Sequence, residues 1–132
     1  MGNIKKLNPL SEWLEFELET PPAWLDSPTV RFRVRPITGL SGFNVTAEDR
    51  APSAAFAAMV IDAIEEWGFT NTVADPQSGK MEQKPLPCTT ETKQGYAGNL
   101  RVLLGSELKG KKGLLGIELA AFAADPENFL KN

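Results

Sequence analysis

Two stretches of alternating residues decide the fold: residues 14–19 read LEFELE, and residues 30–35 read VRFRVR. In both stretches apolar side chains alternate with charged ones. A period of two places the two kinds of side chain on opposite faces of a β-strand. Prolines and small polar residues between them, in 20–28, indicate a turn. The sequence therefore predicts an antiparallel β-hairpin over residues 13–38 with one apolar and one charged face.

The charges also predict how these two strands pair. If Phe16 lies opposite Val34 and Leu18 opposite Phe32, every glutamate on the charged face meets an arginine. This pairing is a better interpretation of the arginines than a nucleic-acid surface, because Phe32, their only aromatic neighbour on the strand, points to the other face. The predicted ion pairs are Glu15 with Arg35, Glu17 with Arg33, and Glu19 with Arg31.

Helical spacing of apolar residues follows further along the chain. Three helices are predicted, over residues 52–67, 90–104 and 114–124, with Thr89 or Thr90 as the cap of the second. Asp62, Glu65 and Glu66 are expected on the solvent face of the first. Residues 70–88 read as a loop, with turn chemistry at 75–80 and a short strand possible near residue 72.

The predicted fold is thus α+β, with an N-terminal antiparallel β-hairpin followed by about three helices packed as one small domain, residues 1–132. Its length of 132 residues suits one domain with its own core. Residues 1–12 are expected to be flexible. No apolar run approaches the roughly 18 residues of a membrane span, so no membrane association is expected.

Composition argues against catalysis. The chain contains no histidine and one cysteine, Cys88, so the usual acid–base and nucleophile pairs cannot form. We expect no catalytic residues, no metal site and no cofactor. The net charge of −3 does not favour nucleic-acid binding. The sequence of the segment Gly105–Lys112 is similar to that of a phosphate-binding loop. However, the segment follows a predicted helix and has lysine where serine or threonine is required.

The C-terminal third is the predicted partner-binding region. Apolar residues surround most of the helix at 114–124, whereas a helix packed on one side needs an apolar arc of only a little over 100°. Two interpretations stay open: a central core helix, or a helix with one side open to another subunit or a client helix. The candidate partner-binding residues are Leu115, Leu119, Phe122, Phe129 and Leu130.

Several segments resemble the tail assembly chaperones of long-tailed (siphovirus-type) phages. They are the helix closing in Ile64-Glu65-Glu66-Trp67, a variable turn with Gly79, and Pro85-Leu86-Pro87-Cys88-Thr89 before a leucine-rich helix. The arginine-alternating strand followed by Pro36-Ile37-Thr38 also fits. The resemblance covers about residues 28–130.

This resemblance implies a specific role. Such chaperones act in the host cytoplasm, self-associate, coat the helical tape-measure protein and keep it soluble until tail-tube subunits polymerise around it. They are not enzymes and are absent from the finished virion. We therefore expect the tape-measure protein, and possibly the tail-tube protein, as partners of a homo-oligomer. The alternative is a structural minor tail or tail-tube-end protein of a phage or prophage.

Overall fold

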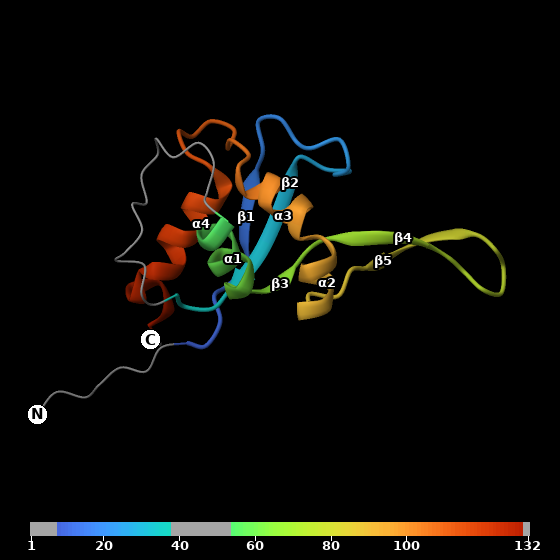
Figure 1. The fold of residues 1–132 in the computed structure, drawn as a ribbon, viewed down its shortest axis with the longest axis horizontal. Coiled ribbons are helices and arrows are strands. Elements are labelled where there is room, and N and C mark those ends of the chain that lie inside the picture. Colours follow the sequence, from blue (N-terminus) through green and yellow to red (C-terminus); the bar gives the residue numbers. More distant parts are fainter. Residues whose placement is uncertain (1–7, 38–53, 131–132) are drawn as a thin grey trace, which may run out of the picture.

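Strand β2 (Thr29–Val34) is the central strand of a three-stranded antiparallel sheet, between β1 (Leu14–Glu17) and β3 (Ile64–Trp67). The structure, a computed structural model, describes residues 8–37 and 54–130 (Figure 1). It confirms the α+β class, with an N-terminal antiparallel sheet followed by helices in a small domain. The remaining elements are α1 (Ala54–Ala63), β4 (Thr70–Ala74), β5 (Met81–Pro85), α2 (Thr90–Gly95), α3 (Ala97–Leu104), α4 (Leu115–Ala124) and the 3-10 helix η2 (Pro126–Phe129).

The first two strands pair antiparallel, but not in the predicted register. Phe16 lies opposite Val30, not Val34, and Glu15 lies opposite Arg31, not Arg35. The shift is an even number of residues, so each side chain keeps the predicted face. Leu18 does not face Phe32, because Leu14 takes that position; Leu18 forms a bridge with Leu108 instead.

The helix predicted over residues 52–67 ends at Ala63, and the chain continues directly as β3; residues 52 and 53 lie outside the described residues. Ile64 and Trp67 are both buried although they are three residues apart, which is helical spacing. The pairing of β2 with β3 shifts register between Arg33 and Val34. Such a bulge adds one residue to a strand, so two residues three apart can point to the same face.

Residues 70–88 contain a hairpin where the sequence predicted mainly a loop. Strands β4 and β5 pair from Thr70 opposite Pro85 to Ala74 opposite Met81. The turn chemistry predicted at 75–80 is present: the Asp75 carboxylate accepts hydrogen bonds from Gln77 N (3.0 Å) and Ser78 Oγ (2.9 Å). These hydrogen bonds lower the pKa of Asp75. The hairpin projects from the body of the domain (Figure 1).

The core lies between the inner face of β2 and three helices. Val30, Phe32 and Val34 are buried and pack in one cluster with residues of α1, α3 and α4. Helices α3 and α4 approach closely, since a Cβ added at Gly116 would lie 3.0 Å from Leu104 Cβ and Leu104 O. Glycine at this position therefore sets how tightly the helical layer packs.

Residues 8–12, expected to be flexible, are held against the domain. Asn8 N donates to Phe129 O, and Ser11 N donates to Val34 O (2.8 Å). Ser11 is buried, and its Oγ accepts from Val34 N (2.9 Å). Residues 1–7 lie outside the described residues. In the described part of the chain, no helix has the length and apolar character needed to cross a bilayer.

The burial of Phe129 generates a stability prediction. This ring near the C-terminal end is 0% exposed and stacks edge-on against Phe122, with ring centroids 5.7 Å apart. We expect Phe129→Ala to lower the free energy of unfolding by about 3 kcal/mol or more, because it leaves a cavity. The matched control is Val102→Ala on α3, where Val102 is 63% exposed; it is expected to change the free energy of unfolding by less than about 0.5 kcal/mol. Urea denaturation measures both, and equal effects would contradict the core position of Phe129.

Candidate functional site

The five residues predicted to bind partners do not form an open surface. Leu115, Leu119 and Phe129 are fully buried in this chain, while Phe122 and Leu130 are partly buried. Helix α4 packs against α1 and α3. The burial favours the first of the two interpretations of this helix: it is the central core helix, and most of its apolar residues are covered by the chain itself.

Arg33 of β2 and Arg35, just after it, form ion pairs with carboxylates of α1 and β3 and not with those of β1. Arg33 Nη1 lies 3.2 Å from Glu66 Oε2, and Arg35 contacts both Asp62 and Glu65, with Nε 3.4 Å from Glu65 Oε1. The predicted pairing with Glu15, Glu17 and Glu19 is therefore wrong. The register shift and the bulge bring the acidic residues around the end of α1 next to the arginines instead. These acidic residues, predicted on the solvent face of a helix, therefore form ion pairs.

One hollow formed by the described residues is a groove between α1 and the α2–α3 pair. Its volume is about 440 Å³. Its lining combines small or apolar residues with polar or charged ones. We call it the helix groove; it is lined by Ala54, Ala57, Ala58, Ile61, Asp62, Thr90, Lys93, Gln94, Ala97, Gly98 and Arg101.

The walls of the helix groove are fixed by capping and by one lysine. Thr89 is the N-cap of α2, as predicted, and its Oγ1 accepts from Thr92 N (3.2 Å). Lys93 Nζ donates to the backbone oxygens of Asp62 and Ile64, where α1 passes into β3. A lysine near the C-terminal end of a helix can donate to the carbonyl groups that have no partner within the helix. The two walls are thus tied to each other at one end.

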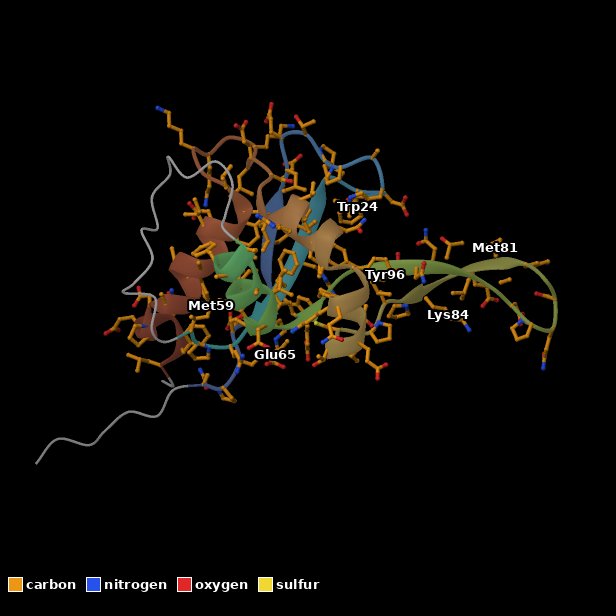
Figure 2. The ribbon with its side chains drawn as sticks, viewed as in Figure 1. Trp24, Met59, Glu65, Met81, Lys84 and Tyr96 are labelled. Atoms are coloured by element: carbon orange, nitrogen blue, oxygen red, sulfur yellow. The ribbon has the colours of Figure 1, made fainter. Side chains whose placement is uncertain are left out.

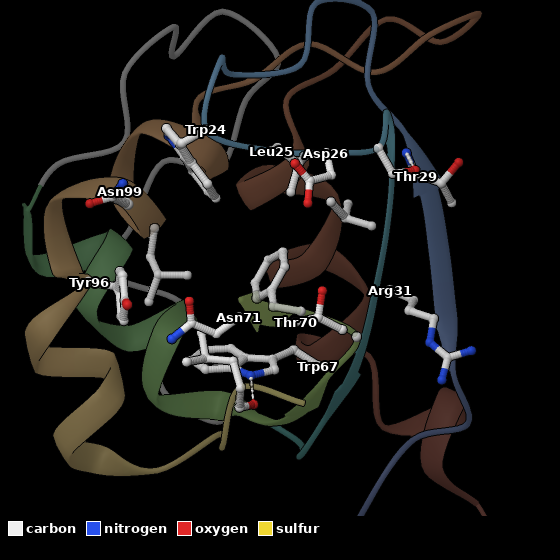
Figure 3. Close-up of a pocket in the computed structure, with 16 residues that line it drawn as sticks. Trp24, Leu25, Asp26, Thr29, Arg31, Trp67, Thr70, Asn71, Tyr96 and Asn99 are labelled. Atoms are coloured by element: carbon white, nitrogen blue, oxygen red, sulfur yellow. Dashed lines mark hydrogen bonds between the residues drawn. The ribbon is translucent and has the colours of Figure 1, made fainter. Parts of the chain in front are cut away.

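Another hollow is an aromatic pocket of about 410 Å³ where the β4–β5 hairpin joins the domain (Figure 3). Phe69 lies at its centre: its ring centroid is 5.3 Å from that of Trp67 and 6.5 Å from that of Trp24. Trp67 Nε1 donates to Leu86 O (2.7 Å), which fixes the base of the hairpin. Trp67 is buried, as the helical spacing predicted, although it stands on a strand.

The rim of the aromatic pocket is open to solvent. Trp24 is 44% exposed and Tyr96 is 40% exposed. Asn71 and Asn99 add amide groups to the lining, and Arg31 belongs to its edge, with its guanidinium pointing away from the aromatic rings (Figure 3). Large aromatic surfaces with polar edges are typical of protein-binding sites. The sequence did not predict this pocket, because the position of Phe69 depends on the unpredicted β4–β5 hairpin.

Arg31 differs from the other two arginines of the stripe. Its guanidinium lies over the Trp13 ring, 4.3 Å from the centroid. Its side chain also packs against Gly68, where an added Cβ would lie 2.7 Å from Arg31 Cγ. Among the described residues no carboxylate lies within ion-pair distance of Arg31. It is therefore a cation held in place at the edge of the aromatic pocket.

The other groups considered for chemistry are the segment similar to a phosphate loop, possible metal ligands and Cys88. The segment resembling a phosphate loop joins α3 to α4: Lys109 N donates to Glu17 O (2.9 Å), and Leu108 is buried. Within residues 8–37 and 54–130, no group of three or more histidine, cysteine, aspartate or glutamate residues is placed to hold a metal ion. Cys88 is half-buried, with Sγ 3.6 Å from Ile64 O.

Comparison with protein-family models, curated proteins and solved structures found no significant match to this chain.

The environment of Cys88 predicts low thiol reactivity. Burial raises the pKa of the thiol above its ordinary value of 9.0, so less thiolate is present at a given pH. We expect slower alkylation by iodoacetamide in the folded chain than in urea at the same pH. The folded thiol holds its proton more tightly, so its stability contribution is present below about pH 9 and is lost as the pH rises through the folded-state pKa. Equal alkylation rates in both states would contradict this environment.

Proposed function

We propose that this protein is a non-enzymatic tail assembly chaperone of a long-tailed phage or prophage, and that it binds the tape-measure protein in the helix groove. The resemblance described above supports the biological role. The observation that carries the site is the groove itself: a hollow between α1 and α2–α3 whose lining includes four alanines, one glycine and one isoleucine. The proposed place of action is the host cytoplasm.

The lining of the helix groove suits a helical client. Ala54, Ala58 and Ile61 lie four and three residues apart on α1, and Gly98 faces them from α3. Small side chains let a third helix approach closely, since helix packing places side-chain ridges in grooves. An amphipathic helix docks in such a groove through apolar residues at i, i+3 or i+4, and i+7.

The charges in the lining would set the orientation of the client. Asp62 stands at one end of α1, while Lys93 and Arg101 belong to the opposite wall. Complementary charges contribute more to specificity and to the rate of association than to affinity. A client helix with an apolar stripe flanked by acidic residues on one side fits this arrangement.

The alternative, a structural minor tail or tail-tube-end protein, is favoured by one observation. The β4–β5 hairpin projects from the domain with both strands largely exposed (Figure 2), as the labelled Met81 and Lys84 show for β5. Exposed strands can pair with neighbouring subunits in a permanent assembly. A structural part would remain in purified virions, whereas a chaperone would be absent from them, and mass spectrometry of virions distinguishes the two.

Filling the groove provides the test of the client site. A Cβ added at Gly98 meets nothing within 4 Å, so Gly98→Leu should fit without strain. Removing a glycine from a helix is expected to stabilise it by about 0.5–1 kcal/mol. We expect the variant to keep or gain stability yet to lose most of its ability to keep the tape-measure protein of the same phage soluble on co-expression. Soluble and insoluble fractions give the readout.

The matched control is Gly95→Leu. Gly95 also has open space at its Cβ position and ends α2, but it does not line the helix groove. This variant should keep the client soluble. If Gly98→Leu folds and protects the tape-measure protein as well as Gly95→Leu does, the helix groove is not the client site.

A further inference from the structure

The β4–β5 hairpin has no third strand among the described residues. Its strands are almost wholly exposed: every residue of β5 and all but one of β4 are exposed to solvent. A two-stranded ribbon on its own is only marginally stable in water, and a third strand or a packed face stabilises it. The hairpin therefore gains stability from any strand added at one of its two edges.

Two backbone hydrogen bonds show which groups point outward at each edge. Leu86 N donates to Phe69 O (2.9 Å) at the base, and Asp75 N donates to Lys80 O (2.8 Å) at the turn. Inward-pointing residues alternate with outward-pointing ones in an antiparallel pair. The outward N–H and C=O groups of β4 thus belong to Thr70, Thr72 and Ala74, and those of β5 belong to Met81, Gln83 and Pro85.

The two edges differ in how well they resist pairing. Strand β5 ends in Pro85, which has no N–H to donate, and carries the charged residues Glu82 and Lys84. Proline and lysine are the residues by which proteins block strand addition at an edge. Strand β4 reads TNTVA, with no charge and no proline. Its β-branched residues favour strand pairing. Only the β4 edge has the character of a docking edge.

We propose that β4 pairs antiparallel with β4 of a second copy of this chain, around a two-fold axis at Thr72. In this register Thr72 faces Thr72 of the second copy, and Thr70 faces its Ala74. All the outward groups of both strands are then used, which gives about six inter-chain hydrogen bonds. The two hairpins form a continuous four-stranded sheet, and no like charges meet, because β4 has none.

We infer a second copy of this chain as the partner because charged residues outside β4 would then lie near residues of opposite charge. Continuing the same register places the second copy's Asp75 opposite Phe69, one residue from Gly68. Gly68 is where the Arg31 side chain packs, and Arg31 has no carboxylate partner among the described residues. The turn of each hairpin thus brings an anion toward the unpaired cation of the other copy.

The aromatic pocket lies in the path of that turn. Thr70 and Asn71, at the base of β4, belong to its lining together with Trp24 and Tyr96. The turn of the second copy contains Pro76 directly after Asp75, and a proline ring packs well against exposed aromatic faces. The pocket and the β4 edge therefore form one continuous self-association surface. This inference does not depend on the proposed client, because it does not involve the helix groove.

Cysteine cross-linking tests the register. In a Cys88→Ser background, Thr72→Cys places two thiols on the two-fold axis, with Cα atoms about 5.5 Å apart, within disulfide range. Gln83→Cys is the matched control, because Gln83 lies directly opposite Thr72 on the other edge of the same hairpin. Mild oxidation should give a disulfide-linked dimer for Thr72→Cys and little for Gln83→Cys. Equal cross-linking of the two variants, or none, would overturn the proposal.

Sedimentation velocity over a range of concentrations tests the interaction without cross-links. The natural chain should form a dimer. Thr72→Pro removes an outward N–H from β4 and should weaken the dimer about tenfold or more, whereas Gln83→Pro removes the equivalent group from β5 and should leave it nearly unchanged. Circular dichroism checks that both variants fold. A natural chain that stays monomeric, or a dimer insensitive to Thr72→Pro, contradicts the β4 interface.

Discussion

Burial of the inner face of β2 is the interaction on which the rest of the structure depends. Phe32 and Val34 are 0% exposed, and the helical layer forms over them. Each large apolar side chain contributes roughly 1.5–3 kcal/mol when it is fully buried. The strand is central, so it also positions β1 on one side and β3 on the other. Displacing β2 would separate the sheet from every helix that covers it.

The positions of the aromatic pocket, the helix groove and the β4 edge follow from the path that the chain takes out of this core. After the bulge in β3, the chain passes Gly68 and Phe69 and enters the projecting hairpin, so the aromatic pocket forms where the chain leaves the sheet. The chain then returns through Leu86 to α2, whose Lys93 is tied to the end of α1. The helix groove and the β4 edge thus lie on different elements, and one copy could hold a client while pairing with another copy.

Much of the fold could be predicted because apolar periodicity reports burial directly. Periodicity identified both N-terminal strands, and the preference for threonine at helix starts identified the cap of α2 at Thr89. Periodicity failed where a helix and a bulged strand place apolar residues at the same spacing: Ile64 and Trp67 fit both equally well. It also failed at β5, whose polar sequence carries no burial signal. The candidate surfaces depend on that hairpin and on which alanines the tertiary structure leaves uncovered, and periodicity reports neither.

Hydrogen–deuterium exchange of this protein with and without the tape-measure protein tests the central claim most directly, which is that client binding and self-association use separate surfaces. At one fixed concentration of this protein, the account predicts that adding the client slows exchange in peptides from α1, α2 and α3 around the helix groove. Exchange in the β4 and β5 peptides should stay unchanged. Protection confined to the hairpin, or no protection around the groove despite binding, would contradict the account.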